Sequence, residues 1–154
     1  MGSPRRMVVG FDGSPEASAA LRYAAARVGG DGVVIAVYAD PPRQDISAAI
    51  DAGTHAHART RATSPREHEI FQALPADNVD GTPLERLVVV DRPSRALIGV
   101  ARDRDADEIV IGTRRHGRVR AALSSVSHDL IHDADRPVVI VPPPNADEAA
   151  AQAS

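Results

Sequence analysis

Five short runs of mostly apolar residues lie along the chain, each separated from the next by a more polar segment. They occupy residues 7–11, 32–38, 87–90, 108–111 and 137–141. Strands that are buried on both faces of a parallel sheet have this continuous pattern, whereas half-exposed strands alternate apolar and polar residues. The runs therefore predict five strands of a parallel sheet.

A helix is predicted directly after the first run. Ser14 is a suitable N-cap, Pro15 fits the first helical position, and Glu16 favours the positive end of a helix. Gly29 and Gly30 are expected to end the helix. Between these signals, apolar residues recur at helical spacing: Ala17, Ala20, Leu21, Ala24 and Val28.

Similar patterns predict further helices from residue 94, over residues 125–134 and, shorter, over residues 65–74. This alternation favours right-handed βαβ units, so the predicted fold class is α/β: a three-layer αβα sandwich around an open five-stranded parallel sheet. Residues 1–142 are expected to form one domain, with an irregular excursion over residues 40–64. The proline- and alanine-rich residues 143–154 are predicted to be a disordered tail.

Composition adds the expected compartment and excludes some partners. The 154-residue chain has a formal net charge of −3, no cysteine and 3% aromatic residues. A weakly acidic chain gives no reason to expect nucleic acid or an acidic membrane surface as a partner. No apolar run approaches the roughly 18 residues that a membrane span needs, and no signal-peptide pattern opens the sequence. We therefore expect a soluble, cytoplasmic protein with an aliphatic core and with no nucleic-acid or membrane partner.

The strongest signal of chemistry lies in residues 108–143. A short strand meets Gly112, an arginine-rich loop follows, and serines at positions 124, 125 and 127 open a helix. Free backbone N–H groups and the helix dipole converge where a strand leads into a helix N-terminus, so α/β proteins hold phosphates there. The segment predicts a phosphate-binding loop.

Two stretches, VVGFDGSPEASAALRYAAA near the start and ADEIVIGTRRHGRVRAALSSVSHDLIHDADRPVVIVP near the end, together resemble the universal stress protein family. The resemblance extends from about residue 7 to residue 141, and residues 40–85 contribute little to it. It implies an adenine-nucleotide α-hydrolase-like fold with strand order 3-2-1-4-5. It also implies a homodimer formed through the last strand and, as in many members, an ATP site.

The resemblance further implies which residues contact ATP or another adenine nucleotide. Asp12 corresponds to an aspartate after the first strand, and Val37 to a valine at the end of the second strand whose backbone meets the adenine. The phosphate and ribose positions fall on the loop and helix start that follow Gly112. The complete implied set is Gly10, Phe11, Asp12, Val37, Ile111, Gly112, Arg114, Arg115, Ser124, Ser125, Val126 and Ser127.

Two of the three glycines of the family's ATP loop are replaced here, by Arg115 and Ser124. Glycine admits positive φ and lets backbone N–H groups approach phosphate oxygens, so these replacements are expected to weaken or change nucleotide binding. Arginines at positions 114, 115, 118 and 120 either supply other phosphate donors or form a solvated loop face. Asp12, Ser124 and Ser125 also have a second interpretation, as caps of their helices.

No catalytic or metal-ligating pattern accompanies this loop. The sequence has neither a nucleophile elbow nor a Ser/His/Asp set at a recognised spacing, so no enzyme activity and no catalytic residue are predicted. His55 and His57 lack a third ligand. His128 and His132 are one helical turn apart, as in a metal-binding pair, but an exposed surface position is the simpler interpretation, and no metal site is predicted.

The last apolar run, from Pro137 to Val141, is expected at an edge of the sheet, where an uncovered apolar strand is a liability. Antiparallel pairing with the same strand of a second copy would cover it, which predicts a homodimer. Three functions stay open. The protein is a dimeric stress-response regulator that binds ATP or another adenine nucleotide without efficient turnover, an interaction module of the same family that binds an unknown protein but no nucleotide, or, least favoured, a slow ATPase.

Overall fold

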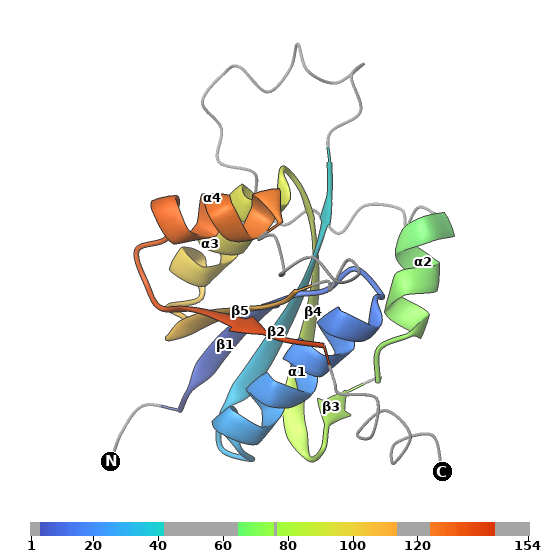
Figure 1. The fold of residues 1–154 in the computed structure, drawn as a ribbon. Helices are drawn as coiled ribbons and strands as arrows, with labels where there is room; N and C mark the ends of the chain where they lie inside the picture. The colour runs from blue at the N-terminus through green and yellow to red at the C-terminus, as the bar shows by residue number, and fades with distance from the viewer. Residues whose placement is uncertain (1–3, 42–64, 76, 114–123, 144–154) are drawn as a thin grey trace.

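A computed structural model of the chain describes residues 4–41, 65–75, 77–113 and 124–143 (Figure 1). Most of the predicted excursion 40–64 and of the predicted tail 143–154 lies outside these residues. The elements in chain order are β1 (Arg6–Gly10), α1 (Pro15–Val28), β2 (Val33–Asp40), α2 (Pro65–Gln72), β3 (Asn78–Val79), β4 (Thr82–Val90), α3 (Pro93–Asp103), β5 (Glu108–Gly112), α4 (Ser125–Asp133) and β6 (Val138–Val141). Every predicted strand and helix is present, with shifted ends.

The sheet has the order β3-β4-β2-β1-β5-β6. Its five long strands are parallel and follow the predicted order, so the α/β fold class is confirmed. The expected count of five strands was wrong by one, because the two-residue β3 adds an antiparallel edge to β4. Asp80 and Gly81 connect them with positive φ at both residues, 49° and 81°. Asp-Gly is the preferred sequence for such a two-residue hairpin turn.

Helices cover both faces of the sheet (Figure 1). α1 and α2 pack on one face, where residues of these helices share a core with Met7, Val9 and Val110. α3 and α4 pack on the other face, in a second core around Val8, Ile35 and Ile109. The chain moves from β1 to β2 in one direction and from β5 to β6 in the other, so the strand order reverses between β1 and β5. Ligands of open α/β sheets bind in the crevice at such a reversal, outside the carboxyl ends of the strands.

The predicted start and end of α1 are confirmed. The Ser14 hydroxyl accepts a hydrogen bond from the Ala17 N–H at 3.1 Å, which satisfies a donor of the first helical turn. Gly29 ends the helix with φ of 72°, and its N–H donates to the Ala25 carbonyl. Alanines at positions 17, 20 and 24 form most of the buried face, so the helix axis lies close to the sheet.

β4 begins at Thr82, five residues before the predicted start at residue 87. The added stretch includes Glu85 and Arg86, so it is not apolar enough to be recognised as a buried strand. Glu85 is half-buried because it pairs with Arg104 at 2.5 and 2.6 Å. Thr82 is buried because its hydroxyl donates to the Ala25 carbonyl of α1. Polar partners thus permit a strand that hydrophobic patterning does not reveal.

β2 and β4 extend beyond their neighbours at the carboxyl end of the sheet. Val37 pairs with Gly10, the last residue of β1, whereas Tyr38, Ala39 and Asp40 continue the pairing with β4. These three residues project the two-stranded ribbon about 10 Å past β1, at about 3.3 Å per residue. The predicted strand 32–38 was therefore too short at this end.

Within the described ranges, no helix is both long and apolar enough to cross a membrane.

Candidate functional site

The carboxyl ends of β1 and β5 form the floor of the candidate site, and the first turns of α1 and α4 begin beside them. Each floor strand ends in a glycine, Gly10 and Gly112. Helix N-termini expose backbone N–H groups and carry the positive end of the helix dipole, so both favour an anion. The topology therefore brings together the two sequence stretches that were expected to share a site.

Gly112 lies directly against the first turn of α1. A Cβ at this position would overlap the Glu16 carbonyl group and would approach the Glu16 Cβ to 2.9 Å. The φ of Gly112 is outside the left-handed region, so the requirement for glycine here is one of space. The glycine that opens the predicted phosphate loop is thus needed for strand-to-helix packing, whatever the loop binds.

Gly10 has more room than Gly112. A Cβ at Gly10 would meet only side chains, Ile111 Cγ2 at 3.2 Å and Leu97 Cδ1 at 3.3 Å. The next residue, Phe11, is buried in the core on the α1 face, and its N–H donates to the Val37 carbonyl at 2.9 Å. Val37 therefore lies inside the sheet with its carbonyl already bonded, and Ala39 and Asp40 occupy the strand end.

The Asp12 side chain organises the turn between β1 and α1. Its Oδ1 accepts a hydrogen bond from the Ser14 N–H at 3.0 Å, and Ser14 is the N-cap of α1. This contact supports the interpretation of Asp12 as a residue that fixes the start of the helix. The exposed carboxylate also lies at the end of β1, where the resemblance places a nucleotide contact.

Ser124 is the N-cap of α4. Its hydroxyl accepts a hydrogen bond from the Ser127 N–H at 3.2 Å and lies 3.0 Å from the Ser127 hydroxyl. Ser127 is fully buried, Val126 is half-buried and Ser125 is exposed. The φ of Ser124 is −62°, so a serine in place of the family's glycine causes no backbone strain here. Arg114 and Arg115 lie outside the described residues.

A profile of the universal stress protein family matches residues 4–142. The chain belongs to this family. Its sequence is 27% identical to the universal stress protein of Archaeoglobus fulgidus, with a TM-score of 0.59 and coverage of 89% of this chain and 98% of that one. A structure of the universal stress protein from the same organism in complex with dAMP is 26% identical, with a TM-score of 0.53 and coverage of 89% and 97%. No curated relative matches the sequence.

A third universal stress protein, solved in complex with cAMP, has the same fold. It is 23% identical to this chain, with a TM-score of 0.57 and coverage of 93% of this chain and all of that one. These matches run over nearly the whole length of both chains, so the universal stress protein domain accounts for the fold from β1 to β6.

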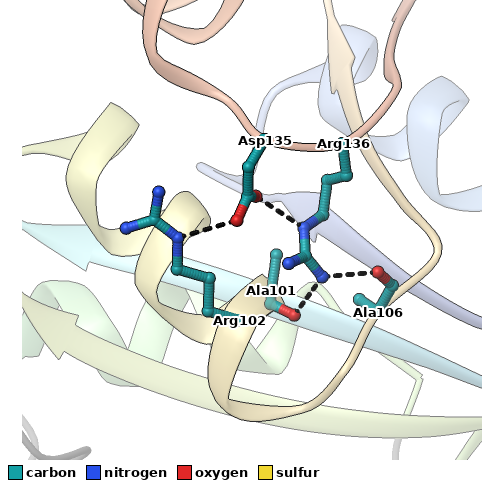
Figure 2. A network of polar contacts seen from close by, with 5 residues as sticks. All are labelled: Ala101, Arg102, Ala106, Asp135 and Arg136. Atoms are coloured by element: carbon teal, nitrogen blue, oxygen red, sulfur yellow. Dashed lines mark hydrogen bonds and ion pairs between the residues drawn. The ribbon is translucent and has the colours of Figure 1, made fainter.

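At the opposite end of the sheet, this universal stress protein has a polar network that was not predicted from the sequence (Figure 2). Arg136, just before β6, donates from Nη1 to the carbonyl oxygens of Ala101 and Ala106, both at 2.6 Å. Its Nε donates to Asp135 at 2.9 Å, and Asp135 also accepts from Arg102 of α3 at 2.9 Å. The network ties the end of α3, the lead into β5 and the lead into β6. The only sequence signal was a charged run, which equally indicates an exposed loop.

Hydrogen bonds from Arg136 and Arg102 hold the pKa of the Asp135 carboxyl well below its usual range. A carboxyl whose pKa is lower in the folded state contributes stability above its unfolded pKa, and that contribution is lost as the pH falls through the lowered value. Asp135 is exposed, so solvent screens this contribution. The contacts of Asp135 with the two arginines are therefore favoured at neutral pH and weaken as the carboxyl is protonated in acid, whereas the bonds from Arg136 to the carbonyls do not depend on this ionisation.

Proposed function

We propose that this universal stress protein is a dimeric regulator of a cytoplasmic stress response, and that it binds an adenine nucleotide without efficient turnover. The binding site is the crevice at the carboxyl ends of β1 and β5. The observation that carries the proposal is the Archaeoglobus fulgidus relative solved with dAMP, a universal stress protein that is 26% identical to this chain over 89% of its length. The first turn of α4, capped by Ser124, supplies backbone N–H groups for the phosphate.

A specific observation favours the alternative, an interaction module that binds no nucleotide. The hydroxyls of Ser124 and Ser127 are bonded to each other, so they are engaged before any ligand arrives. A nucleotide has to replace this contact or rely on backbone N–H groups and arginines. We expect weaker binding than in a family member with all loop glycines.

We predict that titration calorimetry with AMP, cAMP and ATP gives saturable heats for at least one of them, whereas GTP, as the matched control, gives none. Arg115→Gly combined with Ser124→Gly is expected to raise ATP affinity roughly 5- to 10-fold, because side chains at the family's glycine positions hinder the approach of backbone N–H groups to phosphate, at a cost of about 1 kcal/mol or more. Ser124→Gly alone removes a cap but lowers stability by only a few tenths of a kcal/mol, so folding does not obscure the result. Absence of heat with every adenine nucleotide, in both proteins, would establish the interaction module instead.

The dimer part of the proposal rests on the free edge of β6. All four β6 residues are half-buried, and their side chains belong alternately to the cores on the two faces. The carbonyls of Pro137 and Val141 accept hydrogen bonds from the N–H groups of Ile109 and Thr113, on the side of β6 that faces β5. Backbone groups of successive residues in a parallel strand point to opposite sides, so the N–H and C=O groups of Val138 and Ile140 point to the free edge. These outward groups are suited to antiparallel pairing with β6 of a second copy.

An exposed apolar residue of α4 extends this edge. Asp129 accepts from the Ser94 hydroxyl of α3 at 3.3 Å, so Asp129 marks the side of α4 that faces α3. Ile131 lies about 200° further round the helix, on the side away from α3 where the sheet ends at β6. It is 53% exposed, which is unusual for an isoleucine on a packed helix. Strand pairing across a two-fold axis would bring the α4 helices of both copies to the same face of one continuous sheet. Ile131 would then be less exposed to solvent than in the monomer.

We predict that the protein is a dimer at micromolar concentration and that Val138→Pro raises the dimer dissociation constant about 30-fold. Proline removes one outward N–H from each copy, so the symmetric dimer loses two hydrogen bonds. At about 1 kcal/mol for each bond, the loss of about 2 kcal/mol corresponds to this factor. Val138→Ala is the matched control: it shortens the same side chain, keeps the N–H and is expected to stay dimeric. Sedimentation equilibrium measures both constants. A monomeric wild-type protein, or equal dissociation constants for the two variants, would contradict pairing through β6.

A further inference from the structure

Two histidines lie in contact on the exposed surface of α4. His128 and His132 are four residues apart, so they project from the same face of the helix one turn apart. Their ring centroids are 4.6 Å apart, and the ring planes are tilted by 52°. Both side chains are exposed.

The ring nitrogens of this pair are available to a ligand. Across the described part of the chain, neither ring makes a hydrogen bond or an ion pair, and their contact with each other is the recorded interaction of both. His68 on α2 is different, because its Nε2 lies 2.6 Å from the Gln72 side-chain amide. A pair of imidazoles held together without hydrogen bonds to other groups can turn both nitrogens toward one atom.

The spacing of the rings fits a shared metal ion. A zinc–imidazole bond is about 2.0–2.1 Å long, so two rings on one tetrahedral ion have centroids about 5 Å apart. The observed 4.6 Å requires only a small side-chain rotation to reach this value. Two histidines at this spacing on one helix face are also the pair that helical zinc motifs use.

The charges around the pair favour a cation. Asp129 and Asp133 lie on the same helix, each next to one of the histidines in sequence. His132 is in the last turn of α4, where the negative end of the helix dipole attracts positive charge. The helix dipole therefore favours a cation at His132, whereas the Asp129 carboxylate is directed toward Ser94 of α3.

We propose that His128 and His132 bind one divalent transition-metal ion of the class that imidazole prefers, represented by Zn²⁺. Within the described ranges, no cluster of three or more histidine, aspartate or glutamate side chains is placed to enclose a metal. The pair is therefore a two-ligand site, and water completes the coordination of the ion. Because the two ligands are one helical turn apart, the bound ion stabilises the helical form of α4. Both histidines are exposed on α4, and this inference does not depend on nucleotide binding.

The test is titration calorimetry of the untagged full-length protein with zinc chloride. We expect one saturable site, with affinity reduced on the order of 10- to 100-fold in His128→Ala and in His132→Ala alike, because either change converts a chelate to a single ligand. His68→Ala is the matched control, an exposed helical histidine outside the pair, and it is expected to bind zinc as the wild type does. Far-UV circular dichroism checks that each variant is folded.

Two results would overturn the proposal. Unchanged zinc affinity in both His128→Ala and His132→Ala would assign any binding to other histidines. Loss of binding in one of these variants but not in the other would exclude a shared ion. A second readout is the set of histidine ring signals in NMR spectra: zinc is expected to shift those of His128 and His132 together and to leave those of His68 unchanged.

Discussion

Gly112→Ala is expected to destabilise the protein by about 3 kcal/mol or more, or to prevent folding altogether. The new Cβ would overlap the Glu16 carbonyl group in the first turn of α1, and backbone atoms inside a helix cannot move aside as a flexible side chain can. Either α1 shifts away from the sheet or β5 bends. Urea unfolding monitored by circular dichroism measures the loss.

Gly10→Ala is the matched control for this prediction. It adds the same methyl group at the end of the neighbouring floor strand, but the atoms it meets are side-chain methyls of Ile111 and Leu97. These methyls need to move by only a few tenths of an ångström, so we expect a loss of about 1 kcal/mol. Equal losses for the two variants would show that the contact between Gly112 and Glu16 does not limit packing.

Arg136→Ala is expected to lower stability by about 2 kcal/mol, or the thermal midpoint by about 4–8 °C for a domain of this size. The variant removes the donor for two backbone carbonyls, those of Ala101 and Ala106, and breaks the contact with Asp135 (Figure 2). Only 16% of the Arg136 side chain is exposed, so water replaces these bonds incompletely. Calorimetric melting of the wild type and the variant gives the difference.

Arg102→Ala tests whether the effect is specific to Arg136. This variant removes the other partner of Asp135, but both members of that pair are well exposed, at 56% and 42%. Exposed ion pairs contribute about 0.5 kcal/mol or less, so little change is expected. If Arg102→Ala were as destabilising as Arg136→Ala, the ion pair with Asp135, and not the carbonyl contacts, would hold the loop.

The parts of the fold that were predictable are those where the local sequence signals agree with one another. α1 has a cap, an N-terminal proline, an apolar stripe and a closing glycine, and its observed bounds agree with all four. The buried parallel strands are continuous apolar runs because helices cover both faces. The first half of β4 was missed because Glu85 and Thr82 are accommodated through Arg104 and the Ala25 carbonyl, partners that are distant in sequence. β3 was missed because a two-residue strand is too short for any periodicity, although Asp80-Gly81 is a hairpin signal.

The sequence predicted which helix starts and strand ends would meet at the candidate site, but not how their residues contact one another. The sequence correctly indicated that Asp12 and Ser124 would stand beside helix starts, since their side-chain oxygens accept backbone N–H groups there. It could not reveal that Gly112 faces the backbone of α1, because this contact depends on how α1 crosses the sheet. It also could not reveal that β2 runs on past Val37, because Ala39 and Asp40 do not look like strand residues on their own.

The unequal lengths of the strands give the crevice a direction. On one side of the floor, β2 and β4 form a wall that continues past Gly10 from Tyr38 to Asp40. On the other side, among the described residues, β6 ends level with Gly112 at Val141, and the first turn of α4 follows Ser124. The two ends of the site therefore favour different chemical groups. A flat, weakly polar group fits along the β2–β4 ribbon, whereas an anionic group fits at the start of α4. If the proposed nucleotide binds here, the offset between neighbouring strands gives its two ends unlike surroundings.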